Sequence, residues 1–168
     1  MKARLMGLAI LPIMLMGIAI TVLTFTAIRK DVDMDTERTL RGVVYSYLAS
    51  VEQNEGSYEQ KADGSVWKGD YDISHSEAIA DSIKEDGGVD VTFFYGKTRF
   101  MTSVKDDKGE RIVGTDASDD VIEAVLNNGE TLFSTHVLVN GQDYYGYYVP
   151  VFQEGTEEAI GMVFAGLP

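Results

Sequence analysis

The chain contains no cysteine and only two histidines. Without cysteine it forms no disulfide, offers no thiolate nucleophile and has no cysteine ligand for a metal. His75 and His136 lie 61 residues apart with no cluster of further ligands beside either one. We therefore expect a fold held together by its core alone, with no metal and no cofactor.

Sequence motifs of catalysis are also missing. No glycine-rich phosphate loop precedes a helix pattern, and no serine lies in a nucleophile elbow. Two aspartate-rich stretches, 31–35 and 116–120, lack the sixth-position glycine and twelfth-position glutamate of a calcium loop. The first is typical of a solvated helix face and the second of a helix N-terminus. We do not expect an enzyme.

Acidic residues are absent from the first 30 positions, where the run Leu5–Ile28 carries no charge at all. As a helix this run is roughly 36 Å long, which exceeds a hydrocarbon core of about 30 Å. It predicts a transmembrane anchor over residues 1–30. A cleaved signal peptide is the alternative. The run is longer than a typical signal core, however, and a cut after Ala27 would have Phe25 at the −3 position, where a small residue is typical.

Basic residues flank the apolar run almost evenly, with Lys2 and Arg4 before it and Arg29 and Lys30 after it. The positive-inside rule therefore favours neither orientation strongly. A short N-terminus followed by an unbroken apolar run is typical of a start-transfer segment. We expect the remainder to be extracytoplasmic, on a cell membrane crossed once.

The remaining residues, 31–168, carry all 27 acidic side chains but only 10 of the 14 basic ones. Such an acidic segment is unsuited to bind a phosphate backbone, so we expect no nucleic-acid partner. Its length suffices for one ordinary hydrophobic core. We expect a single globular domain.

Hydrophobic periodicity predicts a long helix directly after the anchor. Apolar residues recur at i, i+3, i+4, i+7, i+8 and i+11 from Leu40 to Val51, which defines one helix face. No glycine or proline interrupts the chain between Ile28 and Leu40, and Gly56 follows the pattern. One helix is expected to run from the anchor to about Gln53.

Strand patterns dominate the rest of the chain. A short helix is expected over 76–84, and a second one after Asp116 that ends at Asn127-Asn128-Gly129. Asn140-Gly141 is a strong two-residue hairpin signal. The order of helices and antiparallel strands indicates an α+β fold; strands are expected at 66–67, 71–73, 89–95, 99–104, 111–115, 131–139, 142–152 and 159–165.

Polar aromatic side chains gather on one expected strand, Tyr144-Tyr145-Gly146-Tyr147-Tyr148. Tyrosine combines an apolar ring with a hydroxyl group and so suits a mostly apolar ligand pocket. Arg99 could hold a carboxylate through two parallel hydrogen bonds. Packing within the sheet is the alternative for at least two of the tyrosines, and an exposed charge or an ordinary ion pair is the alternative for Arg99.

Several segments in order resemble the sensor region of bacterial chemoreceptors of the single Cache type. The resemblance covers roughly residues 30–168 and places the anchor where these receptors have one. The segments that carry it are Val91-Thr92-Phe93-Phe94-Tyr95-Gly96-Lys97-Thr98-Arg99, Gly109-Glu110-Arg111-Ile112-Val113-Gly114-Thr115-Asp116-Ala117-Ser118, Gly129-Glu130-Thr131-Leu132-Phe133, Gly141 to Val151, and Ile160 to Gly166.

The resemblance implies a PAS-like Cache fold, in which a long N-terminal helix packs on a five- to six-stranded antiparallel sheet. A small ligand, an organic anion or an amino acid, would bind on the other face of the sheet. The implied homodimer would form through the long helix, with Val32 and Met34 as contacts. The ligand-binding residues implied by position are Arg99, Thr98, Phe133, Tyr145 and Tyr147, with Tyr95 and Thr115 as further candidates.

A membrane-anchored sensor of a bacterial receptor, and above all of a methyl-accepting chemotaxis protein, is the function that the resemblance implies. Such receptors continue into a second span and a cytoplasmic signalling region. With respect to them, the sequence up to Pro168 is either a fragment of a longer receptor or a stand-alone sensor without an output module. Two alternatives stay open. One is a sensor of a histidine kinase or cyclase, and the other is an anchored structural or surface-interaction domain without a small-molecule ligand.

Overall fold

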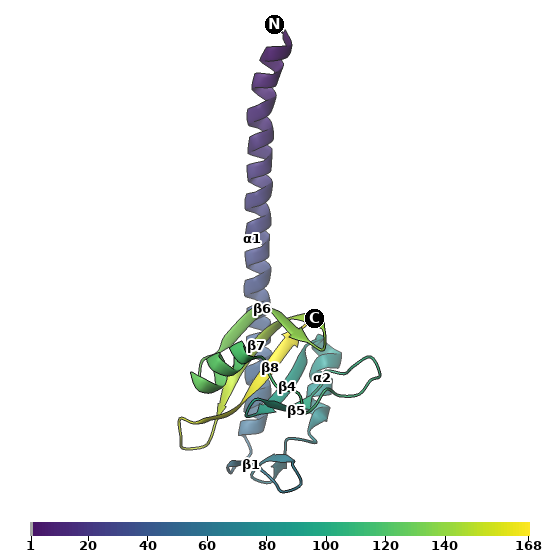
Figure 1. Ribbon diagram of the computed structural model, residues 1–168, viewed down its shortest axis with the longest axis vertical. Helices are drawn as coiled ribbons and strands as arrows, with labels where there is room; N and C mark the ends of the chain where they lie inside the picture. The colour runs from purple at the N-terminus through teal and green to yellow at the C-terminus, as the bar shows by residue number, and fades with distance from the viewer. Residues whose placement is uncertain (1) are drawn as a thin grey trace. The chain divides into compact units, whose positions relative to one another are not determined.

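The computed structural model describes the backbone of residues 2–168 and the side chains of residues 12–168. It contains two compact units, Met1–Thr36 and Glu37–Pro168. The first helix, α1 (Lys2–Glu52), begins in the first unit and ends in the second (Figure 1). Every residue between Ile28 and Leu40 is helical, as the uninterrupted sequence predicts.

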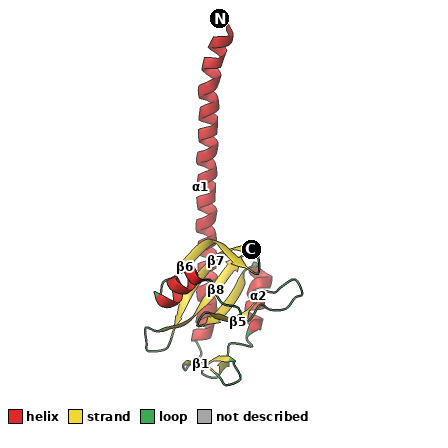
Figure 2. Cartoon of the chain, viewed as in Figure 1, coloured by secondary structure: helices red, strands yellow, loops and turns green. Residues whose placement is uncertain are grey.

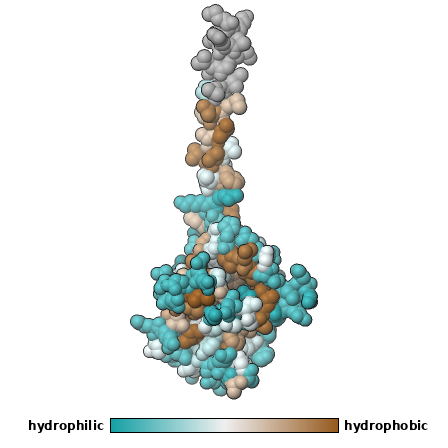
Figure 3. Space-filling view, viewed as in Figure 1, coloured by the Kyte–Doolittle hydropathy of each residue, from teal (hydrophilic) through white to brown (hydrophobic). Residues whose placement is uncertain are grey.

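The first unit consists of the N-terminal part of α1. Among the described residues, α1 is the one helix whose length and composition allow it to cross a membrane, and its apolar window is not buried. Large apolar side chains such as Ile13, Leu23 and Phe25 are each more than half exposed. Figure 3 shows a largely brown, hydrophobic surface along the described part of this segment.

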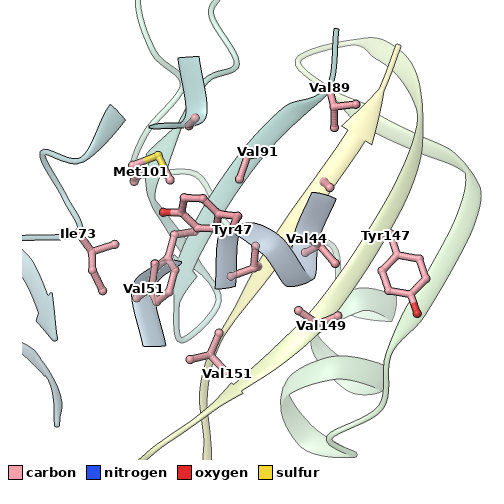
Figure 4. Packing of buried hydrophobic residues seen from close by; sticks show 14 of the residues in the cluster. Val44, Tyr47, Val51, Ile73, Val89, Val91, Met101, Tyr147, Val149 and Val151 are labelled. Carbon is pink, nitrogen blue, oxygen red and sulfur yellow. The ribbon is translucent and has the colours of Figure 1, made fainter. Parts of the chain in front are cut away.

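The second unit begins with the amphipathic part of α1, and the predicted apolar face is confirmed. Leu40, Val44, Tyr47 and Val51 are at most 1% exposed and pack on one face of a β-sheet. Figure 4 shows Val44, Tyr47 and Val51 on the helix beside valines of the sheet strands. Burial of this apolar face stabilises the helix, since helices in proteins gain most of their stability from such packing.

A five-stranded antiparallel sheet, drawn with yellow strands in Figure 2, forms the centre of the second unit. The strand order is β5-β4-β8-β7-β6. Its strands are β4 (Asp90–Tyr95), β5 (Thr98–Thr102), β6 (Leu132–Val139), β7 (Gln142–Phe152) and β8 (Ala159–Leu167). Asn140 and Gly141 both adopt positive φ angles and join β6 to β7, as the hairpin signal predicts. The expected α+β architecture of a long helix on an antiparallel sheet is confirmed.

A smaller sheet and a short helix complete this part of the fold. Strands β1 (Tyr58–Gln60), β2 (Val66–Lys68) and β3 (Tyr71–Asp72) form a three-stranded antiparallel sheet. Helix α2 (Glu77–Gly87) follows and ends at Gly88, whose φ of 70° is favourable for glycine. Ser76 precedes α2, but its hydroxyl donates to the Ile73 carbonyl and caps no helical amide.

The prediction of a strand at 111–115 is wrong. Only isolated bridges form there, Lys105 with Arg111 and Thr98 with Asp116. Gly114 has a φ of 75°, which turns the backbone and prevents a continuous ladder. The segment instead leads into α3 (Asp119–Val121) and the π-helix η1 (Ile122–Asn127), which together occupy the place of the expected second helix.

Candidate functional site

The two faces of the main sheet bury different sets of side chains. Tyr147, Val149 and Val163 point to the face that packs against α1. Tyr144, Tyr148 and Phe164 point to the opposite face, together with apolar residues of α3 and η1. Because side chains alternate along a strand, neighbouring tyrosines of β7 point to opposite faces of the sheet.

The centre of the face opposite α1 is closed by an aromatic side chain. The ring of Phe164 lies 4.8 Å from that of Tyr148 between centroids. A Cβ placed on Gly146 or Gly166 would come within 2.8 Å of the Phe164 ring. The absence of side chains at these two glycines therefore makes room for Phe164.

A cavity of about 500 Å³ lies on the same face, between β6 and the segment that leads into α3. Ligand sites in proteins commonly enclose about 300–1,000 Å³, so this one has the size of a small-molecule site. Its wall combines apolar side chains with a few charged and polar ones. The lining residues are Phe94, Arg99, Asp116, Ala117, Ser118, Asp120, Val121, Leu132, Phe133, Ser134, His136, Val137, Leu138, Val139 and Tyr148.

Arg99 is the buried cation of this cavity and is only 8% exposed. Its Nη1 donates to Thr115 Oγ1 at 2.8 Å and to the Ile112 carbonyl at 3.3 Å, while the buried Nε has no hydrogen-bond partner. Among the described residues it forms no ion pair. Burial lowers the pKa of Arg99, as expected for a cation removed from water without a carboxylate beside it.

A β-bulge turns Arg99 towards the cavity. Phe93 pairs with Met101 and Phe94 with Arg99, so Phe100 is an extra residue in β5. Met101 packs on the α1 side, and the Arg99 guanidinium lies 5.2 Å from the centroid of the Phe94 ring on the other. Without the bulge, two residues two positions apart would share one face.

Tyr148 supplies a phenol to the same wall. It is 4% exposed, and its hydroxyl makes no hydrogen bond to any residue of the described chain. Burial raises the pKa of Tyr148, while the charge of Arg99 acts in the opposite direction. The phenol therefore stays protonated at neutral pH and can donate a hydrogen bond.

Carboxylates lie at the exposed side of the cavity. Asp116 accepts hydrogen bonds from Lys97 Nζ at 2.8 Å and Thr98 Oγ1 at 2.7 Å, and these lower its pKa. Asp120 is exposed and forms neither a hydrogen bond nor an ion pair within residues 12–168. His136, also at this side, is bonded to Asp143 through Nδ1 at 2.9 Å.

The structure brings only part of the sequence-predicted site together. Arg99 lines the cavity, Thr115 holds its Nη1, and Thr98 binds the lining residue Asp116. Phe133 also borders the cavity, but its ring lies 6.4 Å from that of Tyr145 and equally far from that of Tyr147.

Three of the predicted residues lie away from this cavity. Tyr145, Tyr147 and Tyr95 all pack with the cluster on the α1 side of the sheet. Tyr145 and Tyr147 therefore do not line the cavity that contains Arg99. Alternation along β7 places Tyr148 on the same face as Gly146, and the structure shows that this is the cavity face.

Comparison with known families identifies the fold. The model of the family "single cache domain 3" matches residues 71–168, more than half of the chain, and the chain belongs to this family. Single Cache domains are ligand-binding signalling modules, not catalysts. The chain is therefore an extracytoplasmic-type sensor module of a signal-transduction receptor.

Other comparisons add little. No curated protein matches the chain. A solved structure, the E. coli DcuS sensor domain, is 20% identical with a TM-score of 0.38, and the alignment covers 54% of this chain. The chain spans 64% of that domain, less than two thirds of its length.

Proposed function

We propose that the protein is the membrane-anchored sensor of a methyl-accepting chemotaxis receptor and that Arg99 binds the carboxylate of a small organic ligand. Residues 1–30 form the anchor and residues 31–168 the sensor domain. The ligand occupies the cavity between β6 and the segment that leads into α3. Thr115 accepts a hydrogen bond from Arg99 Nη1, and Tyr148 lines the same cavity.

The unpaired burial of Arg99 is the observation that carries the proposal. A charge removed from water is costly unless a counter-charge and hydrogen bonds compensate it. Nε has no partner, and Nη2 makes no hydrogen bond to a described residue, so one edge of the guanidinium is available. A carboxylate fits this edge through two parallel hydrogen bonds.

The other lining residues suit a small ligand with a short apolar body. Leu132, Val137 and Val121 provide apolar walls, and the Tyr148 hydroxyl can donate to an oxygen of the ligand. The combination of one deep cation, one phenol and aliphatic walls favours a small carboxylate over an uncharged or cationic compound.

Signalling in this proposal uses α1. The helix packs on the sheet face opposite the cavity, so a ligand that binds two arrangements of the sheet with different affinity also shifts the helix. Continuous helical structure between Ile28 and Leu40 supports transmission towards the membrane. Val32 and Met34, 49% and 43% exposed, are available for pairing with a second copy.

Binding to the full chain in lipid nanodiscs tests the site. Small monocarboxylates, amino acids and dicarboxylates are screened by thermal shift and then by calorimetry. A ligand at 100 times its Kd should stabilise the fold by about 2.7 kcal/mol. Arg99→Met should remove this stabilisation. Equal stabilisation of wild type and Arg99→Met, or none by any compound, would overturn the proposal.

The type of output needs a separate test. The coding sequence downstream of Pro168 should encode a second span and a methyl-accepting coiled coil. A kinase or cyclase module there would contradict the chemotaxis part of the proposal and leave the binding part intact.

A further inference from the structure

We infer that the ligand is a zwitterion, with its carboxylate on Arg99 and an ammonium group on Asp120 at the mouth of the cavity. This inference rests on the proposed function, since it concerns the second half of the same binding site. It assigns Asp120 as a specificity-determining residue.

The side chains that line the cavity carry charges of both signs. The guanidinium of Arg99 is 8% exposed and lacks a partner on Nε. Asp116 and Asp120 are exposed carboxylates of the same lining. One cavity therefore presents a cation and anions to the same ligand, which matches a molecule that carries both charges.

The two carboxylates are not equivalent. Asp116 is paired with Lys97 at 2.8 Å and accepts a further hydrogen bond from Thr98. Asp120 has no such partner within residues 12–168. Asp120 is consequently the carboxylate left available for an ammonium group, which carries three donors and needs acceptors.

The same arrangement disfavours a second carboxylate on the ligand. A dicarboxylate with one end on Arg99 would bring its other end towards Asp116 and Asp120, and like charges at close range repel. Lys97 neutralises only one of these two aspartates. A monocarboxylate without an ammonium group would avoid this repulsion but leave Asp120 without a counter-ion.

Four-carbon ligands of equal length provide a matched test. Calorimetry on the full chain in nanodiscs compares 4-aminobutyrate, butyrate and succinate, and alanine is compared with propionate. We expect at least one zwitterion to bind about 5-fold or more tightly than its uncharged-tail analogue, as for an ion pair at an exposed site. Succinate should bind more weakly than butyrate.

Two neighbouring substitutions assign the effect to one side chain. Asp120→Asn should reduce the preference for the zwitterion to about 2-fold or less. Asp119→Asn removes the adjacent carboxylate, which does not line the cavity, and should leave the preference unchanged. Equal loss in both variants would overturn the assignment to Asp120.

The outcomes separate this inference from the proposed function. Arg99-dependent binding of butyrate or succinate that equals or exceeds that of the zwitterions would overturn the inference alone. Failure of every compound to bind the folded wild-type chain would overturn the proposed function as well.

Discussion

The hydroxyl of Tyr144 donates a hydrogen bond of 3.0 Å to Oδ2 of Asp90, a residue only 1% exposed. The other oxygen of this carboxylate accepts from Lys84 Nζ at 2.6 Å and from Ser103 Oγ at 2.7 Å. The buried carboxylate of Asp90 in β4 is thus hydrogen-bonded to side chains from α2, from β7 and from the residue that follows β5. Its donors replace the water that burial removes.

Tyr144→Phe should destabilise the fold without changing its shape. The substitution leaves Oδ2 of Asp90 buried without a donor, which costs about 1.5–3 kcal/mol for a hydrogen bond to a charged group. Urea denaturation measures the change. Tyr45→Phe is the matched control, because Tyr45 is 44% exposed and its hydroxyl bonds to no described residue, so the free energy of unfolding should stay within about 0.5 kcal/mol.

Tyr148→Phe and Tyr147→Phe separate the two faces of β7. Loss of the Tyr148 hydroxyl removes a donor from the cavity wall and should weaken ligand binding about 5- to 30-fold. Tyr147 lies on the α1 side, so its variant should bind ligand as the wild type does. Calorimetry with the compound that binds most tightly in the screen measures both affinities. Weaker binding by Tyr147→Phe and unchanged binding by Tyr148→Phe would instead favour the tyrosines predicted from the sequence.

Arg99→Met should leave the ligand-free protein as stable as the wild type, or more stable by up to about 2 kcal/mol. The substitution replaces a buried unpaired charge by an apolar side chain of similar length. Urea denaturation without ligand provides the measurement. A loss of 2 kcal/mol or more would instead make Arg99 a structural residue, held for its bonds to Thr115 and Ile112.

Gly161→Ala should be among the more disruptive single-methyl additions in the chain. A Cβ at this position would lie 2.2 Å from the main-chain oxygen of Phe94, so β4 and β8 would have to separate. We expect a loss of about 1–3 kcal/mol or more. Gly42→Ala is the control with the opposite sign: no heavy atom lies within 4 Å of its Cβ, and alanine should stabilise α1 by about 0.5–1 kcal/mol.

Acid should weaken the ion pair between Asp81 of α2 and Arg111 of the loop after β5. Arg111 donates to both carboxylate oxygens of Asp81, at 2.8 and 2.5 Å, and this hydrogen bonding holds the pKa of Asp81 below its usual range. A carboxylate with a depressed pKa in the folded state stabilises above its unfolded pKa of about 3.9, and the gain disappears as pH falls through the folded value.

Wild type should therefore exceed Asp81→Asn in stability by up to about 1 kcal/mol near pH 7, with the difference vanishing below pH 4 towards pH 2. The partial exposure of both side chains limits the size of the effect. Urea denaturation across this range gives the profile. Glu85→Gln changes another carboxylate of α2 and should preserve the wild-type profile.

The sequence predicted those helices and turns that are determined by neighbouring residues alone. The 3.6-residue recurrence from Leu40 to Val51 identified the buried face of α1, and Asn140-Gly141 identified the β6–β7 hairpin. The stretch 111–115 favours a strand by composition, because Ile112, Val113 and Thr115 are β-branched. Pairing partners and the turn at Gly114 decide against it, and these depend on the rest of the fold.

The site was only partly predictable for a related reason. Alternation shows that Tyr144 and Tyr148 share a face, but it does not show which face α1 covers. For Arg99 the difficulty is greater, because the bulge at Phe100 changes the alternation within β5. The role of Asp120 depends on its place at the cavity, which no spacing in the sequence reveals.

The central position of β8 has a consequence for biosynthesis. This strand pairs with both β4 and β7, yet residues 159–167 leave the ribosome after every other strand described here. The β4–β5 and β6–β7 hairpins can form early as separate pieces, but nothing joins them edge to edge until this last strand inserts between them. Nascent chains should thus expose two unpaired hairpin edges, which calls for chaperone protection until β8 has been synthesised.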